Sequence, residues 1–160
     1  MENQAPAVAR WLGNQVTLEK SYWPNLPSIV ADPALIEQIL RNLVLNAKDA
    51  MPNGGVMTLS TAAVRVDEAK ARCHEGAQPG AYACLSVSDT GCGMSPEVQA
   101  RLFEPFFTTK GSAKATGLGL ATVHGLVKQH FGWVEVSSEE GAGSRFTVFF
   151  PCMSNAESAK

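Results

Sequence analysis

The sequence lacks the features that would place it in a membrane, on nucleic acid or in a disulfide scaffold. No apolar run approaches the roughly 20 residues that a transmembrane helix needs, and the first residues do not form the basic-then-apolar pattern of a signal peptide. The net charge is −2, and the basic residues are scattered apart from a local group at Lys110 and Lys114. We therefore expect no nucleic-acid binding and no membrane contact by this chain. The four cysteines include no Cys-x-x-Cys pair, which favours free thiols in a reducing cytoplasm over a zinc site.

The composition suits one globular domain. Of the 160 residues, 45% are apolar and 18% are charged, enough to build a sizeable core without signs of disorder. Residues 1–27 are expected to belong to the same domain as an N-terminal leader, frayed over residues 1–10, followed by an early strand.

Cap and turn residues divide the chain into strands and helices. Asp32 before Pro33 predicts the start of a helix, in which apolar residues recur every three or four positions until the turn at residues 52–55. Ser95 before Pro96 predicts a second, short helix with the same kind of start. The remaining elements are expected as strands at residues 15–22, 56–66, 81–88, 132–138 and 144–150, a loop at 67–80, and a helix from about residue 117.

An acidic residue stands at the end of one predicted strand. Asp89 follows the apolar run 81–88 and precedes Gly91 and Gly93. Its carboxylate can accept a hydrogen bond from an exocyclic amine, and the glycines allow the backbone to come close to a flat ligand. The arrangement suits a purine base, whereas the motif alone is also common in ordinary turns.

Three polar residues share one stripe of the first predicted helix. Asn42, Asn46 and Asp49 stand at positions i, i+4 and i+7, beside the apolar face. An amide oxygen is a neutral hard ligand of the kind that Mg²⁺ accepts. Such residues otherwise cap a loop or face water.

Phenylalanines crowd one later stretch. Residues 103–110 place three of them beside hydroxyls and Lys110, and the small residues 111–116 follow. Apolar anchors beside a flexible tether are typical of a lid, and the alternative is that the phenylalanines belong to the core with a surface loop behind them.

The third predicted helix starts with glycine. Residues 117–120 read Gly-Leu-Gly-Leu, and glycines at a helix N-terminus expose N–H groups that suit a phosphate. His124 and His130 on this helix have no evident partner carboxylate and are expected at the surface or hydrogen-bonded in the core. His74 follows Cys73 with no second Cys/His pair nearby, so that pair is expected to be incidental.

These stretches, taken together, resemble the ATP-binding catalytic domain of bacterial two-component sensor histidine kinases, within the GHKL superfamily. In order, residues 42–50, 89–94, 103–110 and 116–120 are similar to its N, G1, F and G2 boxes, and 141–144 to its last glycine box. The resemblance runs from about residue 28 to residue 151, which implies an ATP-binding catalytic core at residues 28–151 and a short tail at residues 152–160. It implies the Bergerat fold, an α+β two-layer α/β sandwich in which helices cover one face of a mixed β-sheet.

The resemblance also implies a site for ATP and Mg²⁺. Asn42 and Asn46 would be the catalytic residues, with Asn46 as the metal ligand, and Asp89 would bond the adenine amino group. Ser144 stands where the family often has Thr. The implied cofactor-binding residues are Asn42, Asn46, Asp49, Asp89, Gly91, Gly93, Met94, Thr109, Lys110, Gly117, Leu118, Gly119, Leu120 and Ser144.

The function implied is transfer of the ATP γ-phosphoryl group to a histidine on a separate dimerisation segment of a parent kinase, with a response regulator receiver domain as the further partner. ATPase relatives of this fold carry a Glu four residues before the metal Asn, where this chain has Asn42, and an amide cannot take a proton from water. Anti-sigma serine kinases are expected to lack the Phe-rich box. A GHKL-type ATPase or a nucleotide-sensing module without catalysis remain the alternatives.

Overall fold

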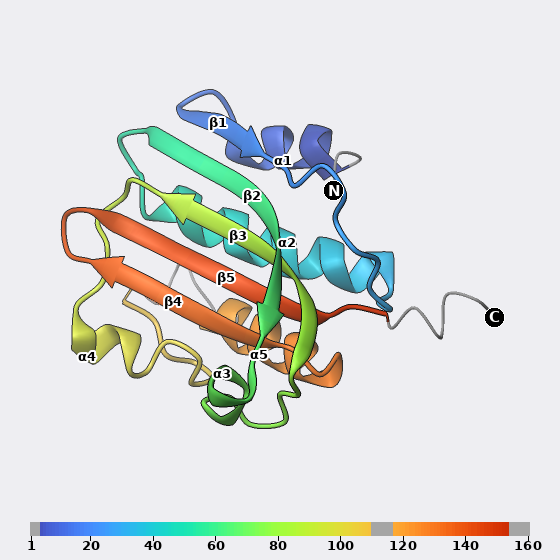
Figure 1. Ribbon diagram of the computed structural model, residues 1–160. Coiled ribbons are helices and arrows are strands. Elements are labelled where there is room, and N and C mark those ends of the chain that lie inside the picture. Colours follow the sequence, from blue (N-terminus) through green and yellow to red (C-terminus); the bar gives the residue numbers. More distant parts are fainter. Residues whose placement is uncertain (1–3, 110–116, 154–160) are drawn as a thin grey trace.

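The computed structural model describes residues 4–109 and 117–153 as a mixed five-stranded sheet with helices. The strands are β1 (Val16–Ser21), β2 (Gly55–Val66), β3 (Gly80–Asp89), β4 (Trp133–Glu139) and β5 (Gly143–Pro151), and the helices are α1 (Ala5–Leu12), α2 (Pro33–Asp49), α3 (Glu68–Arg72), α4 (Pro96–Gln99) and α5 (Gly119–Gln129). The sheet order is β1-β2-β3-β5-β4, with β1 parallel to β2 and every other pair antiparallel. Figure 1 shows α1, α2 and α5 on one side of this sheet. The predicted fold class, a mixed sheet with helices on one face, is confirmed.

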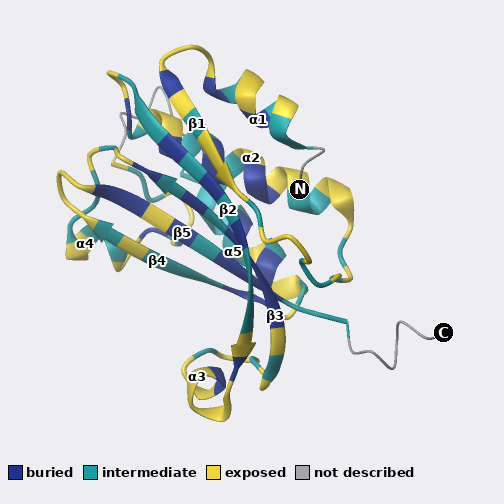
Figure 2. Cartoon of the chain, turned by 45° about the horizontal axis from the view of Figure 1, so that its top comes forward, coloured by how far each residue is buried: buried dark blue, intermediate teal, exposed yellow. Residues whose placement is uncertain are grey.

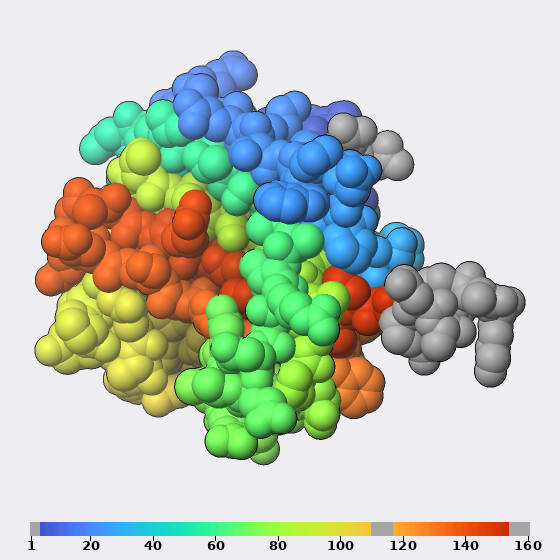
Figure 3. All heavy atoms as spheres, viewed as in Figure 1, coloured from blue at the N-terminus to red at the C-terminus, as the bar shows by residue number. Residues whose placement is uncertain are grey.

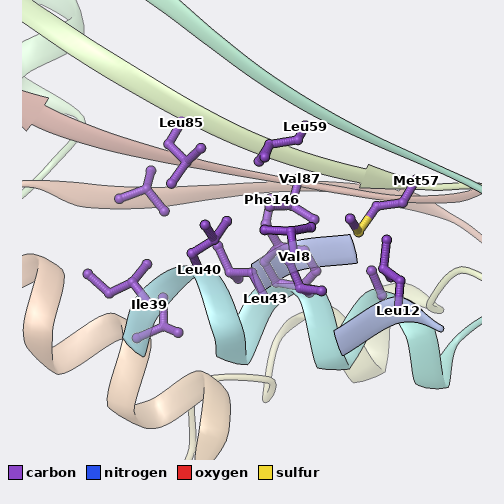
Figure 4. Close-up of a cluster of buried hydrophobic side chains, with 14 of the residues drawn as sticks. Val8, Leu12, Ile39, Leu40, Leu43, Met57, Leu59, Leu85, Val87 and Phe146 are labelled. Atoms are coloured by element: carbon purple, nitrogen blue, oxygen red, sulfur yellow. The ribbon is translucent and has the colours of Figure 1, made fainter. Parts of the chain in front are cut away.

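Helix α2 begins and packs as its sequence predicts. The Asp32 carboxylate accepts a hydrogen bond from the amide of Ala34 (2.9 Å), and Pro33 occupies the first turn. Side chains of its apolar stripe are fully buried against the sheet, as Figure 4 shows for Ile39, Leu40 and Leu43. In Figure 2 the buried positions run along the strands and along α2. This core fixes the position of the polar stripe on the same helix.

The expectation of a frayed leader over residues 1–10 is wrong for its described part. Residues 5–12 form α1, in which Val8 and Leu12 are buried to 0% and 2% exposure in the main core. Its C-terminus is held by Lys48, whose Nζ donates to the carbonyl of Trp11 (3.0 Å). Small residues at the start of the chain suggested disorder, but two apolar residues one turn apart are enough to anchor a helix on a neighbouring one.

The stretch 67–80, expected to be a loop, contains the short helix α3. Asp67 caps it by accepting from the amide of Lys70 (2.8 Å). Figure 3 shows the end of the β2–β3 hairpin, in green, over the face of the sheet that the long helices leave open. There the ring of Trp133 stacks between His74 and Phe149, with centroids 4.5 and 4.7 Å away. A second, smaller apolar cluster therefore covers part of the outer face.

In the described ranges no helix has both the length and the apolarity needed to cross a bilayer.

Candidate active site

A cavity of about 300 Å³ opens between α2, the start of α5 and the segment that follows β3. Its described lining mixes polar and apolar side chains: Asn42, Leu45, Asn46, Asp49, Met94, Val98, Leu102, Phe107, Thr108, Thr109, Gly117, Gly119 and Leu120. Segments far apart in the sequence thus enclose one space, of a size that suits a small ligand.

The polar stripe of α2 forms one wall. Asn42, Asn46 and Asp49 all line the cavity, as their helical spacing predicts. Leu45 lies in the same stripe and adds an apolar contact. The sequence reasoning missed it because only polar residues were considered, although its position three residues after Asn42 carries the signal.

Asp89 lies at the end of β3, five residues before Met94 of the cavity lining, and is only 7% exposed. Its Oδ1 accepts a hydrogen bond from the amide of Gly91 (2.9 Å). Burial raises the pKa of the Asp89 carboxyl, and the amides of Gly91 and Ser144, which donate to it, act in the opposite direction. Asp89 is thus a buried acid held in place by backbone donors.

The turn after Asp89 is wedged between two other parts of the fold. On one side the amide of Cys92 donates to the carbonyl of Ala50 at the end of α2 (3.1 Å), and on the other the Cys92 carbonyl accepts from the amide of Gly141 (2.7 Å). Gly93 has φ 69°, and a Cβ there would overlap the carbonyl of Glu139. The glycine is therefore needed for close approach to the β4–β5 turn, a reason that differs from the expected approach to a flat ligand.

The three phenylalanines of the segment 103–109 have different surroundings. Phe103 packs against the core and stacks on His124, with ring centroids 5.0 Å apart. Phe107 lines the cavity, and the guanidinium of Arg101 lies 4.4 Å from its ring centroid. Phe106 is 75% exposed. Neither expected alternative, anchors of a lid or burial of all three in the core, describes all of them.

The start of α5 forms the wall opposite α2. Gly117 and Gly119 line the cavity, and an ideal Cβ on Gly119 would lie 3.9 Å from the amide group of Asn42. The amide of Phe106 donates to the carbonyl of Gly117 (3.0 Å), which ties the Phe-rich segment to the start of the helix. Lys110 and the stretch 111–116 lie outside the described residues.

The predicted site residues therefore divide into two groups. Those that line the cavity are Asn42, Asn46, Asp49, Met94, Thr109, Gly117, Gly119 and Leu120, and those that do not line it are Asp89, Gly91, Gly93, Leu118 and Ser144. The sequence reasoning also missed Val98 and Leu102, whose spacing of four residues on the predicted short helix was the available signal. Phe107 and Thr108 fall inside the Phe-rich segment but were not singled out.

Comparison with known families gives one match over most of the chain. Residues 31–154 match the profile of the family described as histidine kinase-, DNA gyrase B-, and HSP90-like ATPase. Among curated proteins, the chain is 41% identical over 145 residues to sensor kinase CckA of Brucella abortus and 40% identical over 126 residues to sensor histidine kinase ZraS of Escherichia coli K12. These alignments cover 90% and 79% of the chain but only 15% and 23% of the two relatives.

Solved structures agree in fold. The mycobacterial sensor histidine kinase MprB superposes with a TM-score of 0.72 at 23% identity, over 94% of this chain and 91% of that one. Full-length ShkA, solved in complex with AMPPNP, gives a TM-score of 0.69 at 30% identity, over 96% of this chain and 28% of that one.

Proposed function

The chain belongs to the histidine kinase-, DNA gyrase B- and HSP90-like ATPase family, among the ATP-binding catalytic domains of sensor histidine kinases, and we propose that it holds Mg-ATP and transfers the γ-phosphoryl group to a histidine outside this chain. The observation that carries the proposal is the cavity in which the polar stripe of α2 faces the N-terminus of α5. The similar ShkA, solved with the nucleotide AMPPNP, supports a nucleotide as the ligand.

The phosphates belong at the start of α5. The first amides of a helix have no partner within it and lie at the positive end of its dipole, so they attract an anion. Gly117 and Gly119 place no side chain between these amides and the cavity. We place the base near Met94, which follows the turn after Asp89. The buried carboxylate of Asp89 accepts hydrogen bonds and so suits the adenine amino group.

The donor set of the α2 wall fits Mg²⁺. Asn42, Asn46 and Asp49 present hard oxygen donors to the cavity, without a thiol or an imidazole among its described lining. Asn46 would hold the ion, with the remaining positions filled by phosphate and water. When bound, Mg²⁺ would neutralise charge on the phosphates of the nucleotide.

The α2 wall also favours transfer over hydrolysis. Asn42 lines the cavity at the position where ATPase relatives of this fold are expected to carry a Glu. An amide side chain does not accept a proton from an attacking water, so water is activated poorly. Phosphoryl transfer relies mainly on positioning and on charge stabilisation, which the cavity walls supply without a base on this chain.

The acceptor and the further partners lie outside this chain in this proposal. We place the acceptor histidine on the dimerisation segment of a parent kinase and the next recipient on the receiver domain of a response regulator. We place the domain in the cytoplasm, with no contact to membrane or nucleic acid.

The test is transfer from γ-labelled ATP to the dimerisation segment of the parent protein, with and without Mg²⁺. We expect slow hydrolysis by the chain alone, no label on His74, His124 or His130, and label on the added segment. Asn46→Ala should abolish the label. Fast hydrolysis by the chain alone would favour an ATPase, and nucleotide binding without transfer to the segment would favour a sensing module.

A further inference from the structure

Two side chains outside every predicted motif hold both backbone groups of Met94. The amide of Met94 donates to Oγ of Ser138 on β4 (2.8 Å). Nε2 of Gln99, the last residue of α4, donates to the carbonyl of Met94 (3.0 Å) and to the carbonyl of Ser138 (3.1 Å). Met94 lines the cavity, whereas Ser138 and Gln99 do not. Ser138 and Gln99 thus fix the position of Met94 in the cavity wall without lining the cavity themselves.

The hydroxyl of Ser138 has a second set of contacts. Its Oγ lies 3.0 Å from the carbonyl of Gly143 and 2.8 Å from Oγ of Ser144. A serine hydroxyl has one proton to donate and two lone pairs. One lone pair accepts from the amide of Met94, which leaves the proton and the other lone pair for Gly143 and Ser144. The contacts therefore use the whole hydrogen-bonding capacity of Ser138.

Ser138 is also linked to the buried acid by the register of the sheet. Ser144 on β5 stands opposite Asp89 on β3 and opposite Ser138 on β4, so the three side chains form one row across adjacent strands. Ser144 is 8% exposed. A substitution at Ser138 should therefore affect the proposed adenine site in two ways. It removes a contact with Met94, and it removes a contact with Ser144, which stands opposite Asp89.

We propose that Ser138 and Gln99 are positioning residues that set the affinity of the site for the adenine end of the nucleotide. This inference rests on the proposed nucleotide function. Ser138 acts by fixing Met94 and the hydroxyl of Ser144, and Gln99 acts by fixing Met94 and joining α4 to β4. The pair clamps the turn after Asp89 to the sheet.

The first experiment compares three serine variants by calorimetry with ADP. Ser138→Ala removes the acceptor for Met94 and should weaken ADP binding about 10-fold, the equivalent of losing one or two net hydrogen bonds. Ser138→Thr keeps the hydroxyl and should restore most of the affinity. Ser137→Ala is the matched control, because Ser137 is exposed and points to the opposite face of the same strand; its affinity should equal that of wild type.

A second pair of variants keeps the proposal testable if Ser138→Ala does not fold. Gln99→Ala should weaken ADP binding about 3-fold, since it removes one side-chain bond to Met94. Glu97→Ala, an exposed residue of the same short helix, should leave the affinity unchanged.

A ligand-free measurement separates this inference from the proposed function. With ¹³C-methyl methionine, the Met94 resonance should shift and broaden in Ser138→Ala. The resonance of Met153, which lies beyond the opposite end of β5 and whose amide donates to the carbonyl of Ser28, should not change. Unchanged ADP affinity in both Ser138→Ala and Gln99→Ala would overturn the clamp alone. Equal losses in Ser138→Ala and Ser138→Thr would also overturn it, because the hydroxyl would then not matter. A wild-type chain that binds no ADP would overturn the proposed function, and with it the effect on affinity.

Discussion

Asp89 on β3 and Ser144 on β5 stand opposite each other in the sheet, and both are buried, with exposures of 7% and 8%. The amide of Ser144 helps to hold the Asp89 carboxylate, together with the amide of Gly91. A buried carboxylate with backbone donors on one side keeps lone pairs for a donor on the other. In the proposed function, recognition of the base would thus depend on a pairing between strands that are far apart in the sequence.

Replacing Asp89 should weaken nucleotide binding. Asp89→Asn exchanges an acceptor for a group that can donate, which leaves the adenine amine facing a poor partner and should cost about 1–3 kcal/mol of ADP binding free energy. Calorimetry measures the change. Glu19→Gln removes an exposed carboxylate elsewhere on the sheet and serves as the control. Equal affinity of Asp89→Asn and wild type would remove Asp89 from the site.

The affinity for ADP should depend on pH through the same residue. Burial raises the pKa of Asp89, and the ionised form is the one that accepts the hydrogen bond from adenine. As the pH falls through this raised pKa, the free protein takes up a proton that binding must expel, so the affinity declines. Asp89→Asn should show only the decline caused by the phosphates of the nucleotide itself. Parallel pH curves for the two proteins would contradict this explanation.

Gly117 should resist substitution more than another glycine of the same region. It has φ 69°, and a Cβ would lie 2.5 Å from the carbonyl carbon of Phe106, so Gly117→Ala should lower the free energy of unfolding by about 1–3 kcal/mol. Gly125 lies inside α5 with open space around it, and Gly125→Ala should raise the free energy of unfolding by about 0.5–1 kcal/mol. Urea unfolding measures both. A tolerated Gly117→Ala would mean that the contact with Phe106 can open freely.

Helix α1 should contribute to stability. Leu12 is 2% exposed in the main core, so Leu12→Ala should cost about 2–5 kcal/mol of unfolding free energy. Arg10, exposed on the same helix, is the control, and Arg10→Ala should stay within about 0.5 kcal/mol of wild type. Equal stability of the two variants in urea would show that α1 is not part of the cooperative unit.

The local elements could be predicted because neighbours in the sequence determine them. The cap at Asp32 and the apolar spacing after it predict α2 closely, and the same spacing places Asn42 and Asn46 together on the cavity wall. The start of the chain was misjudged, because the anchoring of Val8 and Leu12 depends on α2 rather than on α1 itself.

The amino-acid sequence by itself determined α2, α4, α5, the strands and the motifs whose resemblance pointed to a nucleotide, because caps, turns and periodicity act over a few residues. Only the tertiary structure decided that β1 pairs parallel with β2, that Gly93 is needed against the β4–β5 turn, and that Ser138 and Gln99 hold Met94. These relationships join segments that are distant along the chain. They follow from the register of the sheet and from the packing of its helices. The spacing of residues within one helix or strand does not determine that register or that packing.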